Sequence, residues 1–88
     1  MTVRAKFKCI SISRGLGSRK DDEGKYVECE LRTVKLQPVY GNGDPSHENA
    51  KFWNATPSGF IELGVINLEA AEGFEIGQEY YVDFSPAA

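Results

Sequence analysis

Two stretches of the chain alternate apolar and polar residues with the period of two that is typical of β-strands. In the first stretch, Ala5, Phe7 and Cys9 alternate with lysines, and Ile10 and Ile12 then alternate with serines. The apolar phase therefore slips by one residue after Cys9. Such a slip either moves the apolar side chains to the other face of the sheet or marks a β-bulge.

The second stretch contains the same kind of slip. Its apolar residues fall first at odd and then at even positions: Val27, Cys29, Leu31, Val34 and Leu36. Two neighbouring strands that both change phase indicate strong coiling, as in small barrels whose strands turn corners. We expect these strands to form a hairpin, with the polar, glycine-rich segment 14–24 as its long and mobile connection.

Turn signals dominate the middle of the chain. Proline and glycine in residues 41–45 and 56–59 predict turns at both places. Between them, residues 46–55 fit two alternatives, a short helical turn with Ser46 as its N-cap or a short strand. The sequence alone does not choose between these alternatives.

The last third of the chain predicts a strand, a brief helix and a final strand. Residues 61–65 alternate as a strand, and Asn67 is expected to cap a helix over residues 68–72. The final strand separates its side chains onto two faces, with Tyr80, Val82 and Phe84 on one and Glu79, Tyr81 and Asp83 on the other. The whole pattern predicts an all-β fold with one short helix, a small coiled β-barrel that is OB-like (oligonucleotide-binding) or SH3-like (Src-homology-3).

The length and composition fit one globular domain over residues 1–88. The hydrophobic share of 41% and the charged share of 26% are close to globular averages, so neither a disordered tail nor a fibrous repeat is indicated. No apolar run approaches the ~20 residues of a membrane span, and charges interrupt the N-terminal segment where a secretory signal is apolar. We expect a cytoplasmic protein, without membrane contact, whose Cys9 and Cys29 are buried and reduced.

Opposite charges are concentrated in the two halves of the chain. Residues 1–40 hold nine of the ten Lys and Arg against five acids, whereas residues 41–88 hold one Lys against eight acids. The simpler interpretation is that the halves attract each other within one fold. The alternative is a basic face that binds a polyanion.

No residue pattern points to catalysis, a cofactor or a metal. The single histidine, His47, has no evident partner for nucleophilic chemistry. Together with Cys9 and Cys29 it makes three zinc ligands, where a structural site needs about four. The acids at residues 21–23 lack the alternating spacing of a calcium loop. We therefore expect a protein that is not an enzyme.

Single-stranded nucleic acid is the first candidate partner. Its binding needs cations along a groove and aromatic platforms on which bases stack. The basic first hairpin and nearby aromatic residues supply candidates for this role: Lys6, Lys8, Arg14, Arg19, Lys20, Arg32, Lys35, Tyr40 and Trp53. The alternative is that the cations only solvate the strands while Trp53 closes one end of the barrel.

A protein is the second candidate partner. Outward aromatic and acidic side chains supply a surface for it: Phe52, Trp53, Phe60, Glu79, Tyr81 and Asp83. The acidic members suit a partner with a basic surface, including an enzyme that normally binds DNA. The open strand edges of a small barrel also favour a homodimer.

Residues 34–41, 49–53, 56–59 and 70–84 together resemble a family of small tailed-bacteriophage proteins of unknown function. The resemblance covers about the last two thirds of the chain and carries over no activity and no functional residue. It implies a viral protein that works in the cytoplasm of an infected bacterial host. Three functions then compete: single-stranded nucleic-acid binding, inhibition or sequestration of a host or defence factor through protein or small-ligand contacts, and a minor role in the virion.

Overall fold

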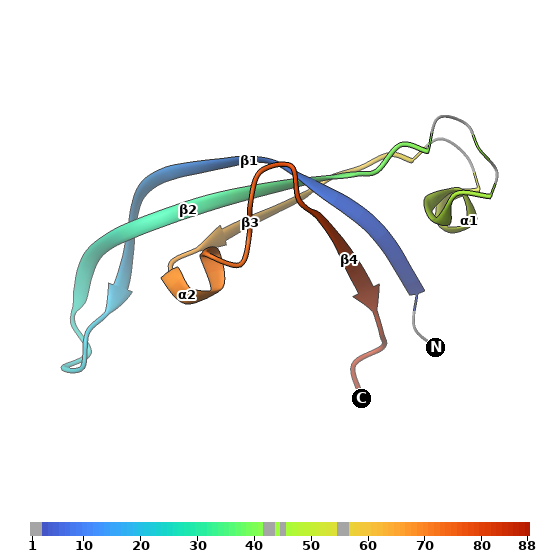
Figure 1. Cartoon of the computed structure of the whole chain (residues 1–88). Helices are drawn as coiled ribbons and strands as arrows, with labels where there is room; N and C mark the ends of the chain where they lie inside the picture. The colour runs from blue at the N-terminus through green and yellow to red at the C-terminus, as the bar shows by residue number, and fades with distance from the viewer. Residues whose placement is uncertain (1–2, 42–43, 45, 55–56) are drawn as a thin grey trace.

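The computed structural model describes residues 3–41, 44, 46–54 and 57–88. In these residues the chain forms β1 (Val3–Lys20), β2 (Tyr26–Pro38), α1 (Glu48–Trp53), β3 (Ile61–Val65), α2 (Leu68–Ala71) and β4 (Glu79–Phe84) (Figure 1). The strands make one antiparallel sheet in the order β3-β2-β1-β4. The mainly β fold is therefore confirmed. Since β3 and β4 lie at opposite edges of the sheet, it is open in the described residues, and closure into a barrel is not confirmed.

The two phase slips have different structural causes. In β1, the register with β2 shifts between Cys9 and Ser11, so Ile10 is the extra residue of a β-bulge. In β2, the pairing runs through Leu31 and Val34 without a shift. The apolar side chains of β2 therefore change from one face of the sheet to the other between these two residues. The sequence predicted either a β-bulge or a change of face at each slip: the structure has the bulge in β1 and the change of face in β2.

A small core lies on one face of the sheet. It consists of the buried residues Ala5, Phe7, Cys9, Val34 and Leu36. Partly buried side chains from β1, α1, β3, β4 and the segment after α2 pack around it, among them Trp53, whose ring centroid is 6.0 Å from that of Phe7. Helix α1 contacts β1, and α2 contacts β3.

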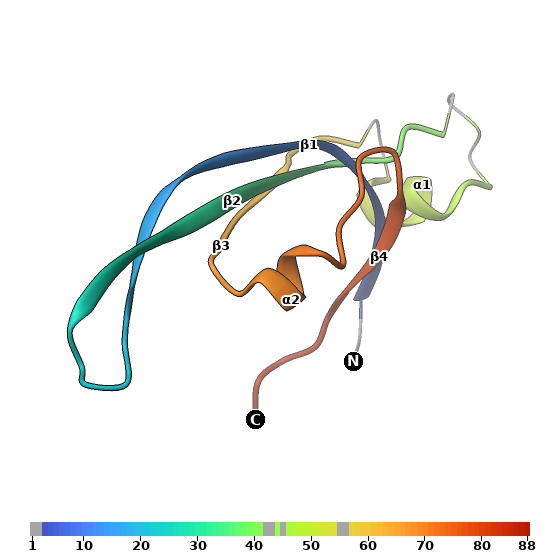
Figure 2. The same ribbon diagram turned by 60° about the vertical axis from the view of Figure 1, so that its left-hand side comes forward.

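Beyond this core, β1 and β2 continue as a two-stranded ribbon, here called the arm. Residues 15–20 pair with residues 26–31, while β3 pairs with β2 only from Arg32 onward and β4 pairs with β1 only up to Lys8 (Figures 1 and 2). The chain reverses over residues 21–25, where Asp21 Oδ1 accepts hydrogen bonds from the backbone N–H groups of Glu23 and Lys25.

The predicted mobile connection over residues 14–24 is therefore wrong for residues 14–20, which belong to β1. Glycine-rich composition suggested a loop, but Gly17 has a packing role within the strand. A Cβ atom on Gly17 would lie 3.0 Å from Cβ of Leu31, so glycine lets the leucine side chain lie close across β1.

The segment 46–55 contains a helix, α1, so of its two alternatives the structure has the helical one. Its N-cap is His47, whose Nδ1 accepts a hydrogen bond from the backbone N–H of Asn49. The predicted cap, Ser46, instead donates to Asp44. Asn67 caps α2 as predicted. Residues 42, 43, 45 and 56 of the predicted turns, and residue 55 of the segment 46–55, lie outside the described residues.

The molecule is elongated for its length. Its radius of gyration is 16.3 Å and its extents are 53 × 32 × 18 Å, whereas a compact domain of this length has a radius of gyration of about 12 Å. Its accessible surface is 6478 Å², about a quarter more than the roughly 5,100 Å² expected for a monomer of this mass. The arm, which extends away from the core in both views, accounts for the shape (Figures 1 and 2).

Candidate functional site

The arm presents two faces of different chemistry, because residues opposite each other in an antiparallel ladder share a side of the sheet. The polar face consists of Leu16, Ser18, Lys20, Tyr26, Glu28 and Glu30. The glycine face consists of Gly15, Gly17, Arg19, Val27, Cys29 and Leu31. Lys20 on the polar face and Arg19 on the glycine face were predicted as nucleic-acid-binding residues, but the two faces were not predicted, because the segment was expected to be a loop.

On the polar face, two large apolar side chains are unusually exposed. Leu16 is 73% exposed and Tyr26 is 72% exposed. The ammonium group of Lys20 lies 5.4 Å from the ring centroid of Tyr26, a cation–π contact that partly orders the ring. A leucine between two glycines in a polar segment was the sequence signal for this surface.

Two ion pairs lie where the polar face of the arm meets the rest of the sheet. Glu30 is shared between Arg14, at 3.2 Å, and Arg32, at 3.5 Å. The Nε atom of Arg32 is buried and makes no hydrogen bond in the described residues, so this second contact is an ion pair of poor geometry. Both arginines are therefore committed to a carboxylate rather than free for phosphate.

The nucleic-acid candidates do not form one groove. Lys6 pairs with Glu48 at 3.0 Å, and Lys35 pairs with Glu62 at 3.7 Å. Lys6 and Arg19 lie toward opposite ends of β1, separated by about 40 Å of chain along the strand. Lys8, Arg19, Lys20 and Tyr40 remain exposed.

Trp53, predicted either as a stacking platform or as a structural residue, packs against the core. It packs on the core next to Phe7, and its Nε1–H donates to the carbonyl oxygen of Ser58 at 3.0 Å. Phe52 covers it further, with ring centroids 4.4 Å apart. These contacts give Trp53 a place in the packing around the core.

Three of the predicted partner-binding residues, Glu79, Tyr81 and Asp83, lie together on the outward side of β4. They form the Tyr81 cluster with Arg4, Lys6 and Glu48. Arg4 makes a bidentate pair with Asp83, at 2.6 and 3.0 Å, and its Cζ lies 4.6 Å from the Tyr81 ring centroid. The Tyr81 hydroxyl donates to Glu48 at 3.1 Å, and Glu79 lies 3.9 Å from Lys6.

The cluster joins basic residues of the first half of the chain to acids of the second half. Lys35 with Glu62 does the same across β2 and β3. The predicted attraction between the halves is therefore confirmed. Since its acids are already paired, the outward side of β4 is not a free acidic surface.

Hydrogen bonds lower the pKa of two acids in the Tyr81 cluster. The Lys6 ammonium, and after it the Tyr81 hydroxyl, lower the pKa of Glu48 below its ordinary 4.5. Arg4 lowers the pKa of Asp83 below 3.8. Because both values are depressed by folding, the stability they contribute is present above the unfolded pKa and is lost as the pH falls through the folded pKa.

Lys6→Met is therefore expected to make stability less sensitive to acid. The urea midpoint of the wild-type protein should fall between pH 7 and pH 3, and the variant should show a smaller fall because Glu48 has lost its principal partner. Lys25→Met, at the exposed end of the arm, is the control and should behave like the wild type. An equal fall in all three proteins would contradict the assignment.

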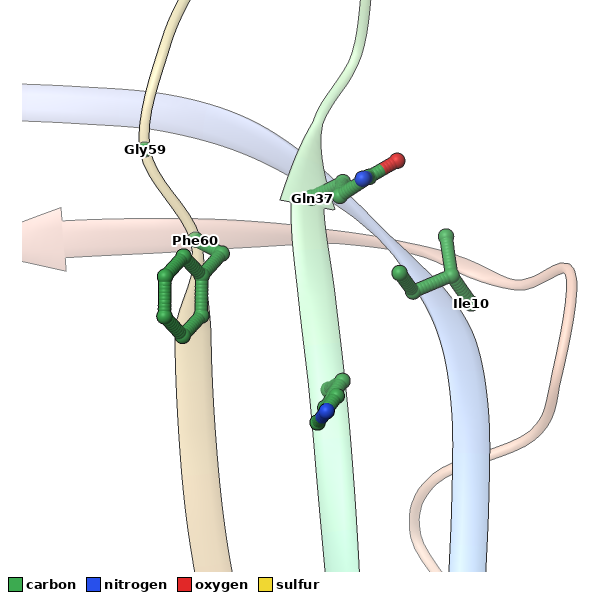
Figure 3. A pocket seen from close by; sticks show the side chains of 5 residues that line it. Ile10, Gln37, Gly59 and Phe60 are labelled. Carbon is green, nitrogen blue, oxygen red and sulfur yellow. The ribbon is translucent and has the colours of Figure 1, made fainter.

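Phe60, another of the predicted partner-binding residues, lies apart from the Tyr81 cluster. It is 68% exposed and borders a hollow of about 260 Å³ with Ile10, Lys35, Gln37 and Gly59 (Figure 3). Figure 3 shows the Phe60 ring and the Ile10 side chain on either side of β2. The hollow is smaller than the roughly 300 Å³ at which ligand pockets begin, so it is a weak candidate for a small-molecule site.

The two cysteines lie on opposite faces of the sheet. Cys9 is fully buried in the core, whereas Cys29 on the glycine face is only half-buried, and both are free thiols. The expected burial is therefore confirmed for Cys9 alone.

The described residues contain neither a metal-binding cluster nor a membrane-spanning helix, and the chain matches no known protein in the three comparisons below. Within the part of the chain that the structure describes, no three His, Cys, Asp or Glu side chains are grouped to hold a metal ion. In the same residues, no helix has the length and apolar character needed to cross a membrane. Compared with protein-family models, curated proteins and solved structures, the chain matches none of them.

Proposed function

We propose that this protein is a non-enzymatic binding module that holds another protein against the polar face of its arm. The observation that carries the proposal is the exposure of Leu16 and Tyr26, above 70% for both, on a ribbon that extends from the core. Tyrosine is enriched among the residues that dominate interface energies, because its ring buries a large area at small entropic cost. An arm is also well shaped to reach into a concave partner surface.

The charges of this face favour a protein over a polyanion. Glu28 and Glu30 stand on it beside Lys20, and the two arginines at its root are paired with Glu30. Phosphates would meet these carboxylates at close range. A partner with mixed charges and an apolar pocket fits better. In the viral context that the resemblance implies, the partner is a host or defence factor, or another component of the virion.

The test is capture from bacterial lysate by the immobilised protein, quantified by mass spectrometry. A double variant, Leu16→Ser with Tyr26→Ser, should lose a specific captured protein by at least about tenfold. Ile76→Ser is the matched control because Ile76 is 65% exposed but lies outside the arm, and it should keep that protein. Identical capture by all three proteins would exclude the polar face as the binding surface.

Single-stranded nucleic acid remains the second candidate, supported by the end of the arm. Arg19, Lys20 and Lys25 are exposed there, and the Lys20 ammonium lies 5.4 Å from the ring centroid of Tyr26. In the same programme of experiments, a labelled single-stranded oligonucleotide is titrated with the protein at two salt concentrations. Tight, salt-dependent binding that Arg19→Ala with Lys20→Ala weakens would favour nucleic acid as the partner.

A further inference from the structure

We propose that the glycine face of the arm is an interface between two copies of this chain, which pack across a two-fold axis near Cys29. This surface lies on the opposite side of the arm from Leu16 and Tyr26. The proposal therefore goes beyond partner binding and does not depend on it. Self-association through the glycine face would leave the polar faces of both copies free.

Apart from Arg19 at its outer end, the glycine face is apolar, and its glycines allow close approach. Val27, Cys29 and Leu31 are half-buried, and Ile66, which is 40% exposed, extends the apolar strip beyond β3. A Cβ on Gly17 would lie 3.4 Å from Cγ2 of Ile66, which places the isoleucine beside the same strip. Because glycine has no side chain, β1 projects no side chain from this face between Ser13 and Arg19, and the side chains of Leu31 and Ile66 lie over Gly17 instead.

The exposed surface of the whole chain is large enough for such an interface. The chain exposes 6478 Å², and its surplus over a typical monomer of this mass is more than the roughly 800 Å² that each partner buries in a standard interface. A two-stranded ribbon is only marginally stable in water when it stands alone. Covering the arm would therefore stabilise the part of the molecule that needs it most.

Charge explains why the occupant is a second copy. In a two-fold interface the same patch meets itself, so any charge near the axis opposes a like charge. Between Arg19 at the end of the arm and Lys35 near the core, this side of the sheet carries no charged side chain on the paired residues of β1, β2 and β3. The polar face of the arm and the Tyr81 cluster both carry several charged side chains.

The first test is analytical ultracentrifugation of the full chain across a range of concentrations. The mass should rise from 9.7 kDa toward twice that value. Val27→Glu places a charge on the glycine face and should raise the dissociation constant of the dimer more than about tenfold. Leu16→Glu introduces the same charge on the polar face and should leave the constant unchanged.

A monomer at every concentration, a dimer that Val27→Glu leaves intact, or equal weakening by both variants would overturn the proposal. Because Leu16→Glu should abolish partner capture while it preserves the dimer, failure of this proposal is distinguishable from failure of the proposed function.

A second measurement uses the wild-type protein, so it does not depend on whether a variant folds. The rate at which a thiol reagent alkylates Cys29 should fall as the protein concentration rises through the dimer dissociation constant. Cys9, which is 0% exposed on the other side of the sheet, is the internal reference and should stay protected throughout. A Cys29 rate that is independent of concentration would also overturn the proposal.

Discussion

Replacing Asn49 by alanine is expected to lower the free energy of unfolding by about 3 kcal/mol. Asn49 is 0% exposed, and its side-chain amide completes the ladder of β1 where β2 ends. Its Oδ1 accepts from the backbone N–H of Lys6 at 2.8 Å, and its Nδ2 donates to the carbonyl oxygens of Lys6 and Val39 at 2.7 and 2.9 Å. Alanine would leave the Lys6 N–H without this partner in a part-buried position.

Urea denaturation followed by the fluorescence of Trp53 measures this loss. Asn49→Asp is a second variant of nearly the same size, and it should also destabilise because it points a carboxylate oxygen at two carbonyl oxygens. Lys51→Ala, exposed on the same helix, should change the midpoint little. Equal midpoints for Asn49→Ala and Lys51→Ala would show that the three hydrogen bonds contribute nothing net.

Phe7→Ala should have the larger effect, a loss of about 3–5 kcal/mol. Phe7 is one of the five residues of the buried core cluster, is 6% exposed and packs against Trp53. Domains of this length have a total stability of roughly 4–13 kcal/mol. The substitution therefore removes a large fraction of the stability of the molecule, because few other buried side chains remain to hold the sheet and α1 together.

Thermal unfolding followed by circular dichroism checks the effect of Phe7→Ala, which is expected to lower Tm or to leave no cooperative transition. Phe60→Ala removes the same side chain from a position that is 68% exposed and should shift Tm little. Similar shifts for the two variants would mean that the core around Phe7 is not the main source of stability.

The period of two in the sequence was sufficient to predict the strands that pack on the core. Residues 61–65, the Asn67 cap and the two faces of β4 are confirmed, because each depends on local alternation or on one capping side chain. The bulge at Ile10 and the face change in β2 both began as the same pattern. The two cases can be told apart only from the register with the neighbouring strand, and the sequence of one strand does not give that register.

The arm was the main failure of prediction. Glycines at residues 15 and 17 favour loops locally, whereas the long-range pairing with Leu31 and Cys29 requires them in a strand. Lys6 and Lys8 alternate with the core residues of β1 as predicted, whereas Arg32 lies on the same side of the sheet as Val34, with a side chain only 19% exposed. The pairing of the candidate cations with Glu30, Glu48 and Glu62 depends on contacts between segments that the local pattern does not relate. Asn49 was missed for the same reason, since its partners Lys6 and Val39 are remote in sequence.

The unshifted register of the arm makes its length adjustable. Because every residue from Ser11 to Lys20 has one partner in β2, removing two residues from each strand between the end of the arm and Arg32 would shorten the ribbon and restore the same alternation of side chains. The core residues Phe7, Cys9 and Leu36 would keep their neighbours. Evolution can therefore lengthen, shorten or redecorate the arm by paired insertions and deletions, so that its binding properties diverge while the domain that carries it stays the same.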